Sequence, residues 1–249
     1  MKLLLINGNR TAAVTETVLA EAQNVAAPGT ELKAVTASFG ADIVFSHAGN
    51  VLAAHAVLDA LARHHAGFDA VILAISFDSG LAAARELVAK PVLGITESGI
   101  RAARTAGQRI GVLTFGNLSS GLYHDVFTRY GVTPQLAAIR TIDIASSAEY
   151  LAAEKLDARI AHEANLLAAE GAAAVVICGA AMAGVARRLR DAVRVPLIDG
   201  VASAIAEAET LVRARTVNPS AAATTQSPSS VPTRVSGVGP ELAALFNRD

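Results

Sequence analysis

The chain has 249 residues, of which 52% are hydrophobic and 17% charged, so it can bury a sizeable core in one or two domains. A formal net charge of −1 and an aromatic content of 4% provide neither the basic surface nor the stacking side chains that nucleic-acid binding requires. The single cysteine excludes an internal disulfide framework, no Cys/His cluster has metal-ligand spacing, and the first apolar run is too short for a signal sequence or a membrane span. We therefore expect a soluble, cytoplasmic protein that binds no metal, membrane or nucleic acid.

Apolar runs of strand length alternate with helical patterns up to about residue 215. The expected strands are 2–6, 31–36, 71–75, 92–95, 110–114, 135–142, 174–178 and 197–198. The expected helices are 12–26, 51–65, 81–89, 97–106, 121–130, 148–170, 182–193 and 202–215. This alternation predicts the α/β class, with parallel sheets covered by helices on both faces.

The composition changes after Arg215. Residues 216–233 are dense in Ser, Thr, Ala and Pro and offer little to bury, which is typical of a flexible linker or an extended arm. The last segment, 240–246, has the pattern of one or two amphipathic helical turns. We expect it to pack on a neighbour.

The sequence contains an internal repeat. A buried-strand pattern that breaks into small residues, followed by an Arg-containing helix and a Pro-led strand, occurs twice, at 69–94 and 173–200. The repeat predicts two similar α/β halves, 1–106 and 107–214, followed by a tail, 215–249. Duplicated halves related by a pseudo-twofold axis place their strand-end loops around one shared active-site cleft.

Several segments carry a family resemblance. They are Asn7-Gly8-Asn9 with Thr15-Glu16, the segment 78–86, Cys178 with Met182, and the segment 195–201. In order and spacing they resemble the hydantoin/allantoin racemase branch of the aspartate/glutamate racemase superfamily, over residues 1 to about 214. The resemblance implies an Asp/Glu racemase-like fold and cofactor-independent chemistry at a carbon next to a carbonyl group. It also implies two cysteines, one from each half, that act as base and acid on opposite faces of the substrate.

Both cysteine positions of that pattern are altered in this chain. Alignment on Asp78 puts Ile75 at the first position, and alignment on Met182 puts Gly179 at the second, with Cys178 one residue early. A one-residue offset within a strand turns a side chain to the opposite sheet face, whereas a rearranged loop could bring it back. If Cys178 reaches the cleft, the natural comparison is the related arylmalonate decarboxylases, which keep one cysteine and protonate an enediolate on one face.

The candidate catalytic residues are Cys178, Ser76 and Asp78, and each has a structural alternative. Cys178 could be a packed thiol on a buried strand. Ser76 can act only beside a base, such as Asp78 or a histidine. Asp78 could equally cap the helix that follows it.

The other polar residues at strand ends are candidates for substrate binding. Hydroxyls, amides and free backbone N–H groups at helix N-termini bind carbonyl and carboxylate oxygens, although the same residues also form turns. These candidates are Asn7, Asn9, Thr11, Ser79, Gly80, Asn117, Ser119, Ser120, Gly179 and Asp199.

The sequence therefore predicts a cofactor-independent racemase or isomerase acting on a small hydantoin, ureide or amino-acid derivative. The missing thiol pair keeps two alternatives open: a lyase or hydrolase on the same scaffold, and a catalytically inactive homologue that binds a small molecule. We expect a homo-oligomer, with a monomer as the alternative.

Overall fold

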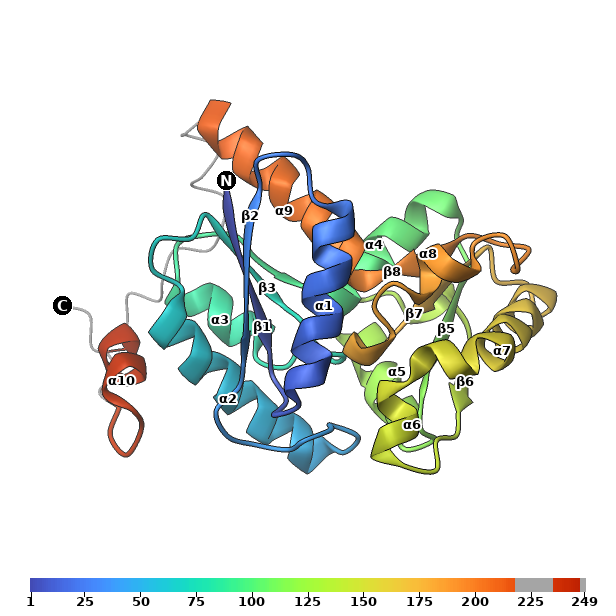
Figure 1. The fold of residues 1–249 in the computed structure, drawn as a ribbon, viewed down its shortest axis with the longest axis horizontal. Helices are drawn as coiled ribbons and strands as arrows, with labels where there is room; N and C mark the ends of the chain where they lie inside the picture. Colours follow the sequence, from blue (N-terminus) through green and yellow to red (C-terminus); the bar gives the residue numbers. More distant parts are fainter. Residues whose placement is uncertain (218–234, 247–249) are drawn as a thin grey trace.

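The computed structural model describes residues 1–217 and 235–246, which form two four-stranded parallel sheets surrounded by helices (Figure 1). The strands are β1 (Lys2–Asn7), β2 (Glu31–Thr36), β3 (Ala70–Leu73), β4 (Val92–Gly94), β5 (Ile110–Phe115), β6 (Leu136–Ile142), β7 (Ala174–Ile177) and β8 (Leu197–Asp199). The α-helices are α1 (Ala12–Val25), α2 (His47–His64), α3 (Leu81–Leu87), α4 (Ile95–Ala106), α5 (Ser119–Arg129), α6 (Ser147–Leu151), α7 (Asp157–Ala169), α8 (Val185–Leu189), α9 (Gly200–Val217) and α10 (Pro240–Phe246). Short 3-10 helices are η1 (Thr133–Gln135), η2 (Ala153–Leu156) and η3 (Ala180–Met182). The predicted fold class, α/β with two parallel sheets, is confirmed.

The two sheets have the same strand order. The first runs β2-β1-β3-β4 and the second β6-β5-β7-β8, so each strand of the first sheet has a counterpart in the second. The registers correspond as well, since Leu3 pairs with Ala70 in the first sheet and Ile110 with Ala174 in the second. In a parallel sheet all carboxyl ends meet at one edge, so the loops after β1 and β3, and those after β5 and β7, lie together.

The last helix of each sequence half packs on the sheet of the other half. α4 follows β4 of the first sheet but packs against β7 and β8 of the second, whereas α9 follows β8 and packs against β3, β4 and α1 (Figure 1). α4 and α9 also pack against each other. The boundary near residue 106 therefore separates the strands of the two sheets, while these helices tie the halves together.

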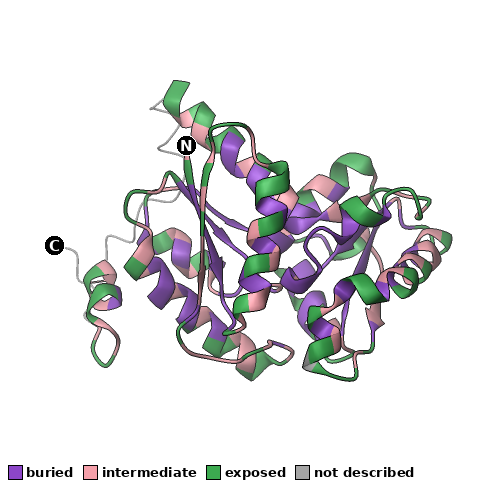
Figure 2. Ribbon diagram, in the orientation of Figure 1, coloured by how far each residue is buried: buried purple, intermediate pink, exposed green. Residues whose placement is uncertain are grey.

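The core is continuous between the sheets. Strands β1, β3, β4, β5 and β7 are buried, β2 and β6 at the sheet edges are mostly half-buried, and most helices bury one face, as Figure 2 shows. Each of the two apolar clusters mixes the halves: one contains Ile72 and Val175, and the other contains Val71 and Val112. Strands covered on both faces need apolar side chains at successive positions, which explains the unbroken apolar runs of the sequence.

Helices α2, α4, α5 and α9 begin at least two residues earlier than the sequence suggests. α2 begins at His47 rather than at residue 51, because the Ser46 hydroxyl accepts a 3.1 Å hydrogen bond from the backbone N–H of Gly49. α4 begins at Ile95 rather than at residue 97, because the Asp78 carboxylate caps its first turn from a distant loop.

The prediction of one long helix over 148–170 is wrong, because α6, η2 and α7 divide that segment. Tyr150, Ala153 and Leu156 are all buried at a spacing of three residues, which matches the three residues per turn of a 3-10 helix. α8 is also shorter than the predicted 182–193, since η3 ends at Met182, Gly184 with φ of +83° precedes α8, and α8 ends at Leu189.

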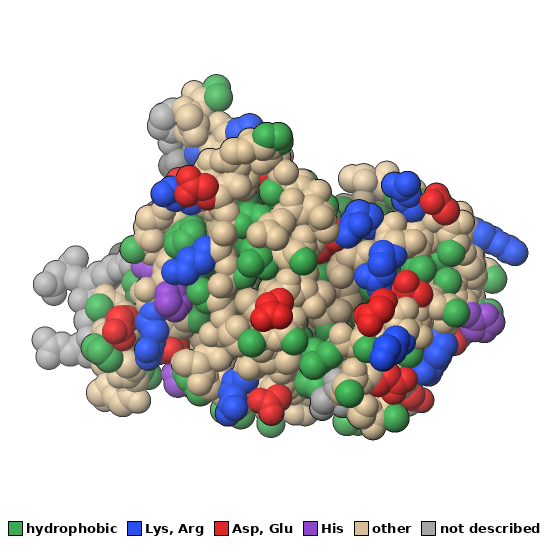
Figure 3. Space-filling model, viewed as in Figure 1, with side chains coloured by type: hydrophobic (Ala, Val, Ile, Leu, Met, Phe, Trp, Pro, Cys, Tyr) green, Lys and Arg blue, Asp and Glu red, His purple; other side chains and the backbone are tan. Residues whose placement is uncertain are grey.

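The helix predicted for 240–246 is confirmed as α10, which packs on α2 of the same chain through the buried Leu242. The predicted linker falls largely on residues 218–234, which lie outside the described residues. Among the helices of residues 1–217 and 235–246, none is long and apolar enough to span a bilayer. On the face drawn in Figure 3, acidic and basic side chains are interspersed.

Candidate active site

Cys178 lies where the two halves meet. It directly follows Ile177, the last residue of β7, and its backbone N–H donates a 2.8 Å hydrogen bond to the carbonyl of Leu113. Its side chain belongs to the apolar cluster that also contains Ile75 and Tyr123, and only 3% of the residue is exposed. The thiol therefore packs between the loop after β3 and the helix α5, although it stands one residue before the position that the family pattern gives to a cysteine.

Burial raises the pKa of the Cys178 thiol; the neighbouring Tyr123 hydroxyl lowers this pKa by less than burial raises it, and the negative charge of Asp78 raises it slightly further. No lysine, arginine or histidine contributes to the pKa of this thiol. At neutral pH the thiol is therefore protonated. It is chemically a proton donor, because a base or a nucleophile would require the thiolate.

Three hydroxyl residues, which we call the hydroxyl cluster, lie together beside the thiol: Tyr123, which neighbours Cys178, and Ser76 and Thr114, which neighbour Tyr123. The Ser76 and Thr114 hydroxyls and the Cys178 thiol all lie close enough to the Tyr123 phenol to affect its pKa, which burial raises well above its ordinary value. The Tyr123 residue is fully buried, yet its Oη atom makes no hydrogen bond of acceptable geometry. Leaving a buried hydroxyl without a hydrogen-bond partner destabilises a protein by about 1–3 kcal/mol. The Tyr123 hydroxyl is therefore a donor that has no acceptor within the protein.

A small cavity, the inner cavity, adjoins Cys178. Its volume is about 10 Å³, and it is lined by Ile95, Thr96, Val176, Ile177, Cys178, Gly179, Ala183, Asp199, Gly200 and Val201. It therefore combines the end of β7 with the first residues of α4 and α9. A volume of about 10 Å³ holds roughly one water molecule.

Gly179, the expected position of the second cysteine, has φ of +132°. A Cβ atom there would lie 3.3 Å from Cε of Met182. Residues that carry a Cβ atom rarely adopt this φ, so the backbone conformation at this position favours glycine.

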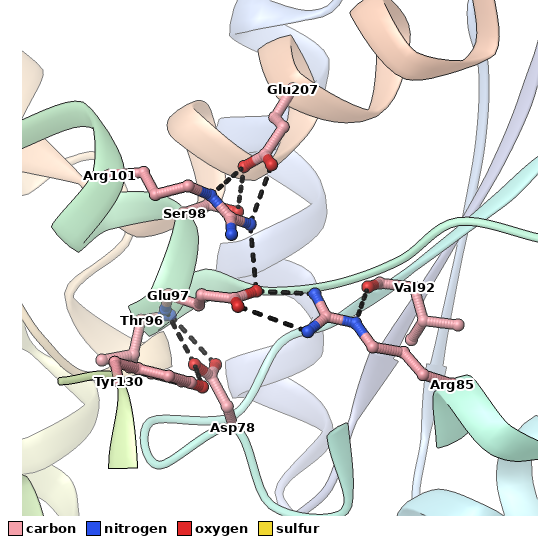
Figure 4. Close-up of polar contacts among 9 residues, drawn as sticks. All are labelled: Asp78, Arg85, Val92, Thr96, Glu97, Ser98, Arg101, Tyr130 and Glu207. Carbon is pink, nitrogen blue, oxygen red and sulfur yellow. Dashed lines mark hydrogen bonds and ion pairs between the residues drawn. The ribbon is translucent and has the colours of Figure 1, made fainter. Parts of the chain in front are cut away.

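Asp78 is almost completely buried and caps α4, not the adjacent α3 that the sequence suggested (Figure 4). Its carboxylate accepts hydrogen bonds from the backbone N–H groups of Thr96 at 3.0 Å and Glu97 at 2.7 Å. The Tyr130 hydroxyl donates a third bond to it, at 2.6 Å. Burial outweighs these bonds and raises the pKa of Asp78 to about 6. The N-cap position of α3 is occupied by Gly80, whose φ is +77°.

Asp199 plays the corresponding part in the second half. Its carboxylate accepts hydrogen bonds from the backbone N–H groups of Val201, at 2.8 Å, and Ala202, at 3.0 Å, in the first turn of α9. It also accepts one from Gly184 at 2.6 Å, which fixes the loop before α8. Burial raises the pKa of this carboxyl as well. The observed contacts are those of a structural support.

The first strand-end loop is internally hydrogen-bonded. The Asn7 amide nitrogen lies 3.0 Å from Oδ1 of Asn9 and 3.0 Å from Oγ1 of Thr15, and the backbone N–H of Thr11 donates to Oδ1 of Asn9 at 2.9 Å. The Thr11 hydroxyl donates to the carbonyl of Asp42. Asn7, Asn9 and Thr11 thus form the loop itself.

Most of the other predicted binding residues also have partners within the protein. The Ser79 hydroxyl donates to the side-chain oxygen of Asn50 at 2.5 Å, and the Ser119 hydroxyl donates to the carbonyl of Phe115 at 2.8 Å. Exposed Asn117 accepts a hydrogen bond from the Thr141 hydroxyl, and Ser120 is half-buried in the first turn of α5. The structure thus brings Cys178, Gly179 and Asp199 to one cavity, and leaves these polar residues in supporting positions.

The sequence analysis missed two tyrosines of the site, Tyr123 and Tyr130, on or directly after α5. They are two of only three tyrosines in the chain and stand seven residues apart, the spacing of one helix face. That pattern could have indicated a helix face directed at the cleft. Among residues 1–217 and 235–246, no group of three His, Cys, Asp or Glu side chains could hold a metal ion.

Comparisons with known proteins agree with this geometry. The family model described as Asp/Glu/Hydantoin racemase matches residues 3–208. A hydantoin racemase of Paenarthrobacter aurescens is 32% identical over 218 residues, covering 85% of this chain and 91% of that protein. The structure of an allantoin racemase from Pseudomonas fluorescens superposes with a TM-score of 0.82 at 31% identity, covering 93% of this chain and 99% of that one. A liganded mutant of arylmalonate decarboxylase shares the fold, with a TM-score of 0.63 at 16% identity, over 85% and 92% of the two chains.

Proposed function

Because the chain belongs to the Asp/Glu/hydantoin racemase family, we propose that it is a cofactor-independent, racemase-type enzyme that acts at a carbon next to a carbonyl group. The proposed substrates are small hydantoins, ureides or amino-acid derivatives. One observation carries the proposal: the only thiol of the chain lies beside a fully buried tyrosine hydroxyl that has no acceptor. A substrate carbonyl oxygen would supply that acceptor.

In this proposal the small thiolate fraction of Cys178 takes the proton from the reacting carbon, and the thiol so formed returns a proton to the enolate. The hydroxyl cluster binds the oxygen on which negative charge develops. Removing a proton next to a carbonyl group produces an enolate, and preorganised donors in a site without water stabilise it. Tyr123 and Ser76 are the proposed donors. Asp78 and Asp199 are positioning residues, because their carboxylates fix the first turns of α4 and α9 beside the thiol.

The test measures proton exchange directly. Single enantiomers of 5-substituted hydantoins, allantoin and amino acids are incubated in heavy water, and deuterium at the α-carbon and loss of optical activity are followed together. We expect exchange in the wild type, loss of more than about 100-fold in Cys178→Ala, and a reduction of about 10- to 100-fold in Tyr123→Phe. Tyr150→Phe is the matched control, since this buried tyrosine packs with Phe115 on the other apolar cluster. Exchange that survives Cys178→Ala unchanged would contradict the proposal.

A lyase is the second candidate, and the protonated state of Cys178 favours it. A single thiol that keeps its proton can protonate one face of an enediolate left by decarboxylation, without first acting as a base. Analysis of the products, with the same variants, distinguishes the two reactions. A lyase releases carbon dioxide from a malonate-type substrate and leaves an optically active product, whereas a racemase removes the optical activity of its substrate. The expected cytoplasmic location and homo-oligomeric state stay predictions, and light scattering during size-exclusion chromatography tests the latter.

A further inference from the structure

A second cavity in the described part of the chain does not touch Cys178. It is an open cavity of about 440 Å³, the outer cavity, between α3, the start of α4 and the end of α5. This volume lies within the range of about 300–1,000 Å³ that is typical of small-molecule sites. Its wall combines both halves, because Arg129 and Tyr130 come from the second half and Leu81, Ala82 and Ala83 from the first.

The outer cavity has an apolar side and a single unneutralised cation. Leu81, Ala82 and Ala83 of α3 supply the aliphatic side. The Arg129 guanidinium donates a 2.8 Å hydrogen bond to the carbonyl of Phe77 and stacks 5.1 Å from the ring centre of Tyr130. These contacts fix the guanidinium, and no Asp or Glu of the described residues forms an ion pair with it.

The second arginine of the outer cavity has no such capacity. The Arg85 guanidinium pairs with the Glu97 carboxylate at 2.6 Å and donates to the carbonyl of Val92 at 2.9 Å (Figure 4). Glu97 and Asp78 also line the cavity, and their negative charges disfavour a ligand of high negative charge. The ligand that fits is therefore singly charged and partly aliphatic.

We propose that the outer cavity binds a small aliphatic monocarboxylate, with its carboxylate on Arg129 and its hydrocarbon part over Leu81, Ala82 and Ala83. Arginine presents a planar pair of N–H donors that matches a carboxylate, and the stacked guanidinium of Arg129 is preorganised for this contact.

Two hydrogen bonds link the wall of the outer cavity to the wall of the inner cavity. Tyr130, which stacks under Arg129, donates to Asp78 at 2.6 Å, and Asp78 accepts from the backbone of Thr96 at 3.0 Å. Thr96 lines the inner cavity together with Cys178.

Binding can be measured without any turnover. Calorimetry with potassium butyrate, at ionic strength held constant with potassium chloride, is compared with butyramide, which has the same shape without the charge. We expect butyrate to bind and butyramide to bind at least about tenfold more weakly, since the charged hydrogen bonds to arginine are lost. Arg129→Ala should weaken butyrate binding by a similar factor, and Arg104→Ala, an exposed arginine of α4, should not.

Two further variants complete the test. Ala82→Glu, at an exposed position of α3, puts a carboxylate at the edge of the outer cavity and should also weaken butyrate binding, so the test does not depend on the folding of one variant. Cys178→Ala should bind butyrate as the wild type does, which separates this site from the proposed active site. Equal binding of butyrate and butyramide, unchanged binding in both Arg129→Ala and Ala82→Glu, or loss of binding in Cys178→Ala would overturn the proposal.

Discussion

Asp78 and Asp199 bind the same two amide positions of corresponding helices from different places in the chain. Each carboxylate accepts hydrogen bonds from the second and third residues of a helix, at 3.0 and 2.7 Å for Asp78 on α4, and at 2.8 and 3.0 Å for Asp199 on α9. Asp199 ends the strand that leads into its helix, whereas Asp78 reaches α4 from the loop after the neighbouring strand. The duplicated fold has thus kept the cap and changed the residue that supplies it.

The position that corresponds to Asp199 in the first half is Gly94, the last residue of β4. A Cβ atom on Gly94 would lie 2.3 Å from Cγ of Asp78, because the carboxylate fills that space. Gly94→Ala should therefore destabilise the protein by about 1–3 kcal/mol in urea unfolding, as overpacking of a closed site does. Gly121→Ala, where an added Cβ meets nothing within 4 Å, is the control; it should not destabilise the protein, and it should add up to about 1 kcal/mol of stability because Ala is the better helix former in α5.

The exchange of the two residues should restore the cap. In Asp78→Gly/Gly94→Asp, the new carboxylate stands two and three residues before the amides of Thr96 and Glu97, the separations that Asp199 has from its own partners. We expect the double variant to be more stable than either single variant. Simple addition of the two single costs, measured in the same urea experiment, would refute the equivalence of the two caps.

The raised pKa of Asp78 predicts a pH dependence of stability. Burial raises this pKa from 3.8 to about 6, so between these values the native carboxyl keeps a proton that the unfolded chain has lost. The free energy of unfolding should fall as pH rises through this interval, by on the order of 3 kcal/mol at most for a shift of this size.

Urea unfolding of the wild type and Asp78→Asn at about pH 4.5 and about pH 7 isolates this carboxyl, because Asp199 titrates in both proteins. The wild type should lose more stability between these two pH values than Asp78→Asn does. Parallel pH profiles of the two proteins would show that Asp78 has an ordinary pKa.

The sequence predicts the strands well because both faces of each sheet are covered. The buried strands β3, β5 and β7 are then short apolar runs. The edge strand β2 is half-buried to exposed, and its predicted bounds, 31–36, agree with those observed. Helix boundaries depended on more distant groups. Nothing near Ile95 in the sequence shows that Asp78, from another loop, caps its helix.

For the candidate site, too, local patterns in the sequence were informative and contacts between distant residues were not. Strand-end loops indicated the position of Cys178, because parallel strands bring their carboxyl ends together. The role of Tyr123 depends on how α5 packs across the two halves, which no local pattern records. The polar loop residues were predicted to bind substrate, but a side-chain amide can bind either a ligand or its own loop. The Asn7 amide binds side chains of its own loop and of α1.

Gly179 is expected to resist substitution because of its backbone. Gly179→Ala should cost about 1–3 kcal/mol in unfolding experiments, since φ of +132° is unfavourable for any residue with a Cβ atom. Contact with Met182 could contribute, because the added Cβ would lie 3.3 Å from Cε of that residue. The double variant Gly179→Ala/Met182→Ala separates these causes: if the cost of Gly179→Ala persists without the Met182 side chain, the backbone is responsible. A cost that disappears would assign it to the contact.

The buried thiol of Cys178 should react slowly. Alkylating agents attack the thiolate, and burial raises the pKa of this thiol while leaving only 3% of the residue exposed. Iodoacetamide at about pH 8 should therefore modify the native protein at least about tenfold more slowly than the same chain unfolded in urea, as followed by mass spectrometry. The unfolded chain serves as the control because it carries the same single cysteine. Equal rates would mean that the thiol is exposed and ionised, and Cys178 would then fit the role of a base better than that of the proton donor proposed above.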